Sequence, residues 1–486
     1  MAVLALAAAV RLPLLLQTGE ADFLSHDGRE YRDISYQLSQ GHGFSIGYYR
    51  WYEPVPPHAP AIHSDVYRPP LLPLLGAPLF WLPLPWLYSA KALLFCLDML
   101  LVLCGMALAG VLARDLLWAR VLAGLVLALN VNLVFYATKW STETLSALCV
   151  LATLYALARA ADAAQPRRWG LVAGAALGLS VLARPNVFLL AVFLFAALLW
   201  LAWRGGTVRR QCARRRAAKG RWHCPQTVPS PQSGERKPPS ADSGTNAPSR
   251  GNRLWLAVLL WLAVGLATVL TPWTVRQGLS GAGYTPLTAF GPYSHWMGTH
   301  PRMLESYRAA DRASFARAQK DIYFVDTVAA LTRLAEEGLF EPAQTGPRWR
   351  EWASEWASAH PSDAALLYGY RLVHFLKPWP STFIAPAWQL WLVGLTNVAC
   401  WALAVFWLCG GPLSWRRGAF FLLAPAANLL GCLPFVFHLR FRFPLTEVPL
   451  AVLAGVGLSS LLARRAARPG GPGARAYFPV PHPSAE

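Results

Sequence analysis

The sequence predicts an all-α polytopic membrane protein with about ten transmembrane helices. Hydrophobic residues make up 55% of the 486 residues and charged residues only 14%, and the mean hydropathy is +0.33. Several apolar segments approach the length needed to cross a hydrocarbon core of roughly 30 Å. The net charge of +19 is concentrated in one linker and in short turns, as expected for Lys and Arg that stay cytoplasmic. There is no basic groove with interleaved aromatic residues, so we expect no nucleic-acid partner.

Residues 1–203 are expected to form an N-terminal transmembrane module. Its first helix is predicted over 2–16, and Arg11 within this apolar run argues against a cleaved signal peptide. A polar first loop follows at 17–68. The next segment, 69–84, holds five prolines and is predicted to be a broken interfacial helix. Further spans are expected at 86–112, 116–137, 141–160, 169–184 and 187–203.

Residues 204–253 differ sharply in composition from the rest of the chain. They hold 12 Lys and Arg against two acidic residues and are rich in Pro, Ser and Gly. Such a segment cannot bury enough apolar surface to offset its ordering entropy, so we predict a disordered basic cytoplasmic linker. Two of the eight cysteines lie here and six lie in apolar segments, a pattern that suggests no disulfide framework.

Residues 254–463 are expected to form a C-terminal transmembrane module. After a span at 254–273, the loop 276–363 holds nine Lys and Arg and ten Asp and Glu, and helical patterns at 303–320 and 345–360 predict a small folded extracytoplasmic subdomain. Aromatic residues and prolines at 368–384 suit the membrane interface. Spans at 386–409, 417–437 and 444–463 precede a cytoplasmic tail at 464–486. With the N-terminus inside, both long loops face out.

Charged residues stand at the outer ends of these spans. One such residue alone could be an interfacial side chain that reaches water, but a set gathered on one side predicts an anion-binding cleft. Arginines there suit a phosphate whose tail stays in lipid, and a carboxylate suits a base that takes a proton from a hydroxyl. We therefore predict sugar transfer from a polyprenyl phosphate, with cations stabilising the departing phosphate. The set comprises Asp27, Arg68, Lys139, Glu143, Arg184, Arg276, Arg440 and Arg442.

Two other classes compete with this hypothesis. A secondary transporter would place its substrate site near the bilayer midplane between repeated halves, whereas here no repeat is evident and the charges stand at span ends. The other alternative is an inactive protein of the same architecture that acts as a scaffold for assembly or binding. Because its cavity would keep the same charged residues, only loss of transfer after Asp27→Asn separates it from an enzyme.

The first loop also raises the question of a metal. His26, His42, His58 and His63 lie in it, with Asp65 close by, and imidazole and carboxylate are common metal ligands. Their spacing matches no standard ligand motif, so ordinary loop histidines are the favoured interpretation. No cofactor is firmly expected, and a divalent metal is the alternative.

Short motifs along most of the chain are similar to those of one family. They are HDGREY at 26–31, GHGF at 41–44, RPPLLPLL at 68–75, STETL at 141–145, GLSVLARP at 178–185, TPWTVRQ at 271–277 and RFRFPLTEVPL at 440–450. In order and spacing they resemble membrane glycosyltransferases of the GT-C architecture, specifically the dolichyl-phosphate-mannose-protein mannosyltransferase-like family and its bacterial relatives that modify lipid A with aminoarabinose.

The resemblance implies roles for individual residues. Asp27 matches the first-loop acid that acts in that family as the catalytic base or as a contact to the reacting centre. Arg68 matches the basic residue before Pro-Pro that would contact the donor phosphate. Arg184 and Arg442 match basic positions that face the same cavity, and we assign Arg440 to donor binding with them. The expected acceptor or cavity residues are Tyr31, Lys139, Glu143 and Arg276.

The resemblance also implies the course of the reaction and its setting. Many relatives carry Asp-Glu at the first motif, whereas Gly28 follows Asp27 here, so a role of the second acid in metal or acceptor binding is vacant or passes to Glu30. The reaction would invert the anomeric centre in one displacement. The expected partners are a polyprenyl-phosphate-linked sugar, a protein, lipid or glycan acceptor, and membrane lipids. A bacterial plasma membrane is the expected location.

Overall fold

The structure, a computed structural model, describes residues 1–25, 27–50, 52–116, 118–162, 165–218, 250–309, 311–378, 387–410, 412–434 and 442–466. Helices make up nearly all of the regular structure in these residues. The two strands found there, β1 (Ser45–Ile46) and β2 (His63–Ser64), form one short antiparallel pair within the first loop. The predicted all-α class is confirmed.

Six helical stretches are long and apolar enough to cross a membrane. They lie in α5 (Trp86–Leu112), α8 (Thr142–Asp162), α10 (Phe188–Ala218), α11 (Arg250–Leu279), α18 (Ala387–Leu408) and the pair η4 (Phe443–Glu447) and α21 (Val448–Ala466). Other helices of the same bundle are α1 (Ala2–Gln17), α6 (Ala119–Leu129), α9 (Pro166–Ala183) and α19 (Pro412–Cys432). These helices follow the predicted spans in order, which confirms a polytopic membrane protein.

Local polar residues divide some segments that the sequence predicts as continuous. The predicted span 116–137 is interrupted at Asn130, whose side chain accepts a hydrogen bond from the Leu133 amide (3.1 Å) and so begins α7 (Val131–Tyr136). The proline-rich segment 69–84 contains only α4 (Leu71–Gly76) and the 3-10 turn η1 (Ala77–Trp81), in agreement with a broken helix.

The predicted basic linker 204–253 overlaps helices at both ends. The backbone of α10 continues to Ala218 and that of α11 begins at Arg250. Residues 219–249, the centre of the predicted linker, lie outside the described residues, as do residues 467–486 of the predicted tail. The disorder predicted for the linker therefore stays a prediction.

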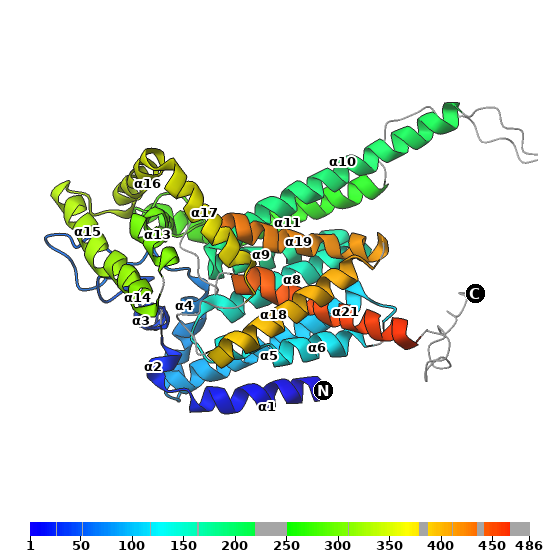
Figure 1. Cartoon of the computed structure of the whole chain (residues 1–486), viewed down its shortest axis with the longest axis horizontal. Helices are drawn as coiled ribbons and strands as arrows, with labels where there is room; N and C mark the ends of the chain where they lie inside the picture. Colours follow the sequence, from blue (N-terminus) through cyan, green and yellow to red (C-terminus); the bar gives the residue numbers. More distant parts are fainter. Residues whose placement is uncertain are drawn as a thin grey trace, which may run out of the picture.

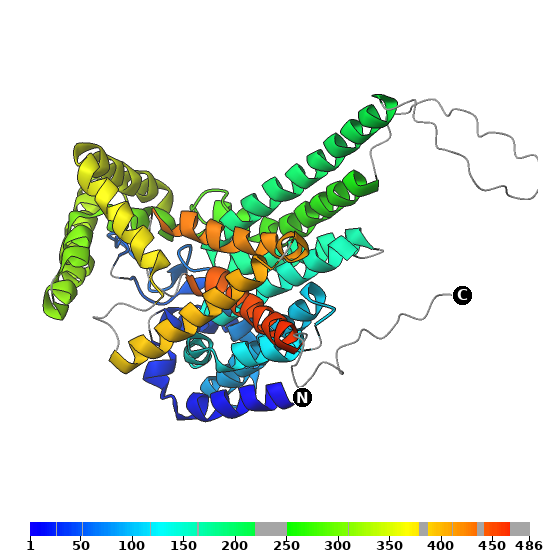
Figure 2. The ribbon, with the colours of Figure 1, turned by 45° about the vertical axis from the view of Figure 1, so that its right-hand side comes forward.

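The two predicted outer loops lie together at one end of the helical bundle. On the left of Figure 1 the first-loop elements α2 (Glu20–Phe23), α3 (Gly28–Ser39) and α4 stand beside helices α13–α17, and Figure 2 shows the same grouping after rotation. The start of α1, the far ends of α10 and α11, and the end of α21 lie at the opposite end. The loops therefore share one side of the bundle, as the predicted topology requires.

Glycines bring α9 and α11 into unusually close contact. Gly170, Gly174 and Gly178 recur every fourth residue on α9 and face α11, the small-residue spacing common at membrane helix interfaces. A Cβ atom on Gly174 would lie 2.1 Å from the Leu262 carbonyl oxygen, and one on Gly265 would lie 2.4 Å from that of Leu171. No larger residue fits at this seam without separating the helices.

Arg11 anchors α1 inside the bundle. Its guanidinium pairs with Asp98 of α5 and donates to the carbonyl oxygens of Ala128 (2.6 Å) and Leu127 (3.0 Å) at the end of α6. Both charged side chains are buried. A buried charge is tolerated where it is paired and hydrogen-bonded, which explains a charge within the apolar run. The start of the first loop is fixed as a consequence.

Helices α12 to α17, residues 290–376, form a compact unit that we call the outer subdomain. Their bounds are α12 Phe290–Thr299, α13 Pro301–Arg308, α14 Arg312–Asp321, η3 Ile322–Asp326, α15 Thr327–Glu336, α16 Pro342–Ala359 and α17 Pro361–Leu376. The unit has its own aromatic-rich core. Buried Arg371 ties it to the bundle, because it donates to the carbonyl oxygens of Leu433 (2.6 Å) and Gly298.

Candidate active site

The first loop packs directly on the start of α8. The Trp140 amide donates to the Phe23 carbonyl oxygen (2.8 Å), and both rings are buried in a cluster that joins the loop to α5 and α8. A Cβ atom on Gly28 would lie only 3.0 Å from the Trp140 carbonyl oxygen. Gly28 therefore occupies a position with little room for a side chain, and this close approach sets Asp27 beside the bundle.

Asp27, Glu30 and Arg68 form one group of charges. Arg68 Nη2 lies 3.1 Å from Asp27 Oδ1, and Arg68 grips Glu30 through Nε (2.7 Å) and Nη2 (2.8 Å). Glu30 is one turn along α3 from Asp27, so both carboxylates face the same arginine. The predicted proximity of Asp27 and Arg68 is confirmed, and Glu30 lies in the same group.

A second arginine that the sequence reasoning missed completes the group. Arg50 is buried and contacts Glu30, Glu53 and Asp65 at once. Asp65 also accepts hydrogen bonds from the amides of Tyr67 (3.0 Å) and Arg68 (2.8 Å). The only signal in the sequence is YYRWYEP, which places Arg50 among aromatic residues three positions before Glu53; Glu30 and Asp65 come from other parts of the loop.

Tyr31 connects this group to a second ion pair. Burial raises the pKa of the Tyr31 hydroxyl above its usual value; Asp27 and Glu143 raise it further, and Arg68 and Arg184 oppose them. Arg184 Nη1 lies 2.5 Å from Glu143 Oε1. The residues of four distant segments thus act on one hydroxyl group, which stays protonated at neutral pH and can donate a hydrogen bond.

Arg442 lies in a different, fully buried cluster. It donates through Nε to Glu447 (2.9 Å) and through Nη1 to the carbonyl oxygens of Phe375 (2.8 Å) and Lys377 (2.5 Å). Asn132 Nδ2 donates to the other Glu447 oxygen (2.5 Å). These contacts join α17 and α7 to η4, so they suit a structural position better than donor binding. Arg440, also expected to bind the donor, lies outside the described residues.

Lys139 and Arg276, predicted as acceptor or cavity residues, both hold the first loop. Lys139 Nζ donates to the Asp22 carbonyl oxygen (2.9 Å). Arg276, near the end of α11, donates through Nη2 to the Phe44 carbonyl oxygen (2.6 Å) and to Ser64 Oγ (2.6 Å), and through Nη1 to the Asp65 carbonyl oxygen. Both side chains therefore orient the loop that carries Asp27.

The described first-loop histidines are dispersed. His42 Nδ1 lies 2.7 Å from Gln37 Oε1, His63 stacks on Tyr49 with ring centroids 4.0 Å apart, and His58 is exposed. Within the described part of the chain no group of three or more His, Cys, Asp or Glu side chains is placed to hold a metal ion. His26 lies outside the described residues. The alternative of a divalent metal stays untested.

The fold and the charged group at one end of the bundle define the class of the protein: a polytopic membrane protein with charged residues gathered in its first loop. Residues 84–217 match the family model of dolichyl-phosphate-mannose-protein mannosyltransferase. The predicted resemblance to this family is therefore confirmed over that part of the chain. No curated protein matches the sequence.

One solved structure supports the fold, and two others align with lower scores. The Archaeoglobus fulgidus oligosaccharyltransferase in complex with Zn and sulfate aligns with a TM-score of 0.50 at 14% identity, over 95% of this chain and 49% of that one. AglB from the same organism, with an inhibitory peptide and a dolichol-phosphate, gives 0.48 at 14% identity over 95% and 50%. ArnT from Cupriavidus metallidurans bound to undecaprenyl phosphate gives 0.34 at 14% identity over 96% and 78%. The chain spans about half the length of the archaeal enzymes.

Proposed function

We propose that the protein is an integral-membrane glycosyltransferase that moves a sugar from a polyprenyl-phosphate donor to an acceptor hydroxyl on the extracytoplasmic face. The observation that carries the proposal is the group in which Asp27, Glu30 and Arg68 meet beside Tyr31. The family match over residues 84–217 and the lipid phosphates named with AglB and ArnT point to the same class of donor.

Asp27 is the best placed of the nearby carboxylates to act as base. Its side chain is 24% exposed, against 15% for Glu30 and 3% for Glu143. Glu30 is held by Arg68 and Arg50, and Glu143 is paired with Arg184. An incoming hydroxyl group can therefore reach Asp27 more readily than the others, and Asp27 would take its proton as the new bond forms.

The reaction is a single displacement with inversion. The acceptor oxygen bonds to the anomeric carbon as its proton passes to Asp27, the bond from that carbon to the phosphate oxygen breaks, and the phosphate leaves with the electron pair. Arg68 and Arg184 are the two described arginines near Tyr31 that could stabilise the resulting charge. Because both are paired with carboxylates, donor phosphate must share them with these partners. In this arrangement Glu30, not the residue at position 28, supplies the second acid of the motif.

The proposed side of the membrane follows from charge distribution. The Arg-rich ends of α10 and α21 lie opposite the end that carries the first loop and the outer subdomain (Figure 1). Positive charge favours the cytoplasmic side, so the Asp27 group would face out. A bacterial plasma membrane remains the proposed location.

The experiment uses the purified full chain in lipid nanodiscs, a panel of dolichyl- and undecaprenyl-phosphate sugars, and release of the polyprenyl phosphate as readout. Asp27→Asn should lower turnover by about 10²- to 10⁴-fold, the usual contribution of a general base. Asp22→Asn is the matched control, because Asp22 is an exposed acid of the same loop whose contact with Lys139 is made by its backbone. Undiminished turnover of Asp27→Asn would remove the proposed base, and an EDTA-treated sample tests the metal alternative.

A further inference from the structure

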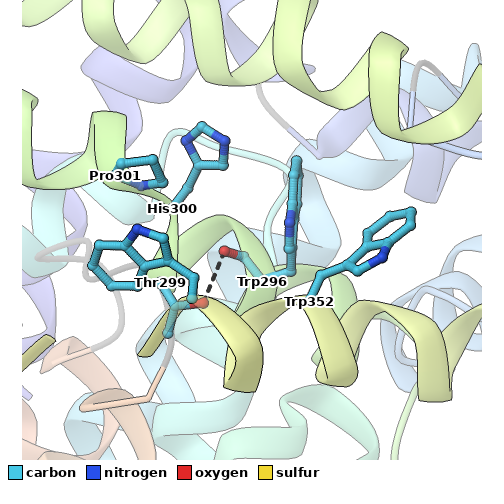
Figure 3. A pocket seen from close by; sticks show the side chains of 6 residues that line it. Trp296, Thr299, His300, Pro301 and Trp352 are labelled. Atoms are coloured by element: carbon cyan, nitrogen blue, oxygen red, sulfur yellow. Dashed lines mark hydrogen bonds between the residues drawn. The ribbon is translucent and has the colours of Figure 1, made fainter. Parts of the chain in front are cut away.

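A concave site lies in the outer subdomain, apart from the charged group around Asp27. A cavity of about 180 Å³ opens where the end of α12, the start of α13 and the side of α16 meet (Figure 3). Figure 3 shows the indole rings of Trp296 and Trp352 and the imidazole of His300 around it. It is lined by Trp296, Thr299, His300, Pro301, Trp352 and Trp356, which we call the tryptophan pocket.

The tryptophan pocket combines aromatic faces with a few polar groups. Trp352 is 9% exposed, and its Nε1 is buried without a hydrogen-bond partner among the described residues. A buried N–H group left unpaired is costly and therefore rare. Thr299 donates its hydroxyl proton to the carbonyl oxygens of His295 (3.0 Å) and Trp296 (3.1 Å), and its oxygen can still accept.

His300 adds a polar ring whose Nε2 faces Asp326, at 3.8 Å from Oδ2. Its Nδ1 accepts a hydrogen bond from the Arg302 amide (3.3 Å), as the cap of α13. Burial lowers the pKa of the imidazole below its usual value, although Asp326 opposes this shift. The neutral ring therefore carries its proton on Nε2. The pocket thus offers flat apolar walls, with the Thr299 hydroxyl oxygen and the edge of the His300 ring as its polar groups.

We infer that the tryptophan pocket binds a neutral sugar ring of the acceptor, an inference that rests on the proposed glycosyltransferase function. A sugar ring presents an apolar C–H face to an aromatic surface and hydroxyl groups at its edge to donors and acceptors. The cavity volume of about 180 Å³ equals that of about six water molecules in the liquid, at ~30 Å³ each. It is below the ~300 Å³ at which sites for drug-sized ligands begin. One ring is the scale that fits.

Charge separates this ligand class from two others. No charged side chain lines the pocket, so a phosphate would lack a counter-charge there. A quaternary ammonium ion can sit against tryptophan faces, but Arg333 and Arg348 already lie over the Trp352 ring, at 5.0 and 5.5 Å from its centroid. Both arginines pair with Glu337 (3.3 and 2.9 Å), and Arg348 pairs with Glu351 as well, so this ring face is occupied by a group without net charge. A neutral ligand with hydroxyl groups meets neither obstacle.

The pocket is joined to the Asp27 group by a chain of aromatic contacts. The Tyr52 hydroxyl lies 3.5 Å from Glu30 Oε2. From Tyr52, three successive ring contacts of 5.3 Å each lead through Tyr293 and Trp349 to Trp352. The Tyr52 and Trp352 centroids are therefore at most about 16 Å apart. An acceptor with more than one sugar unit could occupy the pocket while another part of it reaches Asp27.

Trp356 is the residue of choice for the test, because it lines the pocket but is only half-buried. Saturation-transfer NMR with the full chain in nanodiscs would use methyl α-mannopyranoside, methyl β-glucopyranoside and tetramethylammonium chloride as probes. Wild type and Trp356→Phe should bind a glycoside through its ring protons, and Trp356→Leu should weaken binding about fivefold or more, given the usual size of an aromatic contact. Trp388→Leu, a change at an exposed tryptophan of α18, is the control.

The outcomes distinguish the pocket from the proposed reaction. The inference that the tryptophan pocket binds a sugar is refuted if neither glycoside binds wild type, or if Trp356→Leu leaves glycoside binding unchanged. Preferential binding of tetramethylammonium also overturns it, in favour of a cation site. Asp27→Asn should keep glycoside binding while it loses transfer, so loss of the base and loss of the sugar site give different results. In transfer assays Trp356→Leu should raise the acceptor KM and leave kcat nearly unchanged.

Discussion

Replacing Arg442 by methionine would test whether this arginine stabilises the fold or binds donor phosphate. Its contacts in the structure are with Glu447 through Nε and Nη2 (2.9 and 2.8 Å) and with the carbonyl oxygens of residues 375 and 377. Arg442 is fully buried and Glu447 nearly so. The substitution leaves a buried carboxylate without its counter-ion while preserving much of the side-chain volume.

The expected cost follows from that burial. Removing one member of a buried ion pair typically lowers the free energy of unfolding by about 3–5 kcal/mol, because the remaining charge is uncompensated. Glu447→Gln should cost a similar amount. In the double variant no unpaired charge remains, and the amide of Gln can still accept from Asn132, which donates to Glu447 at 2.5 Å. The double variant should therefore lose less than the sum of the single ones, with a coupling of up to about 3 kcal/mol.

The assay is unfolding of the four proteins in mixed micelles, followed by fluorescence, with the donor KM of each measured beside it. We expect strong non-additivity in stability and a donor KM for the folded Arg442→Met fraction close to that of wild type. An Arg442→Met protein as stable as wild type but with a donor KM raised by tenfold or more would refute this reasoning and restore Arg442 to donor binding.

Two further predictions concern residues that hold the outer face. Arg276→Gln should make the first loop more susceptible to limited proteolysis, and lower stability by about 2 kcal/mol, because it loses charge-assisted bonds to carbonyl oxygens of Phe44 and Asp65; equal cleavage rates would contradict the tether. His300→Asn keeps a capping acceptor for the Arg302 amide but cannot titrate. Since the folded His300 pKa lies below its usual value near 6.5, the unfolded chain binds the proton first, and stability is lost as pH falls below about 6.5. Thermal unfolding at pH 7.5 and 5.5 should show a smaller loss in His300→Asn, and identical losses would count against the prediction.

The bundle could be predicted from the sequence because membrane helices are set by length and hydropathy, which are local properties. The predicted span 86–112 coincides with α5. Breaks within apolar runs were harder to place, since they depend on single capping residues. Asn130 begins a new helix through one hydrogen bond, and a hydropathy profile does not detect such a cap.

The charged group was predictable in part. Asp27 and Arg68 stand at the two ends of one loop, so their proximity follows from the loop returning to the same membrane face. The partner of Arg442 was missed for a geometric reason. Residues five apart do not share a face of an α-helix, but η4 is a π-helical turn, whose wider winding lets Arg442 meet Glu447. Arg50 was missed because two of its three partners, Glu30 and Asp65, reach it only through the tertiary fold of the loop.

The glycine seam between α9 and α11 has a consequence for how the proposed lipid donor would enter. Arg184 directly follows α9, and Arg276 lies in the last turn of α11. Arg184 pairs with Glu143 and Arg276 holds the first loop, so both arginines are positioned by two helices that pack closely against each other. The contact between α9 and α11 leaves no space for another molecule between them. Under the proposed function, a long isoprenoid chain would have to enter between other helices of the bundle. A bulkier residue at Gly174 would shift α9 against α11 and so disturb the positions of Arg184 and Arg276 together.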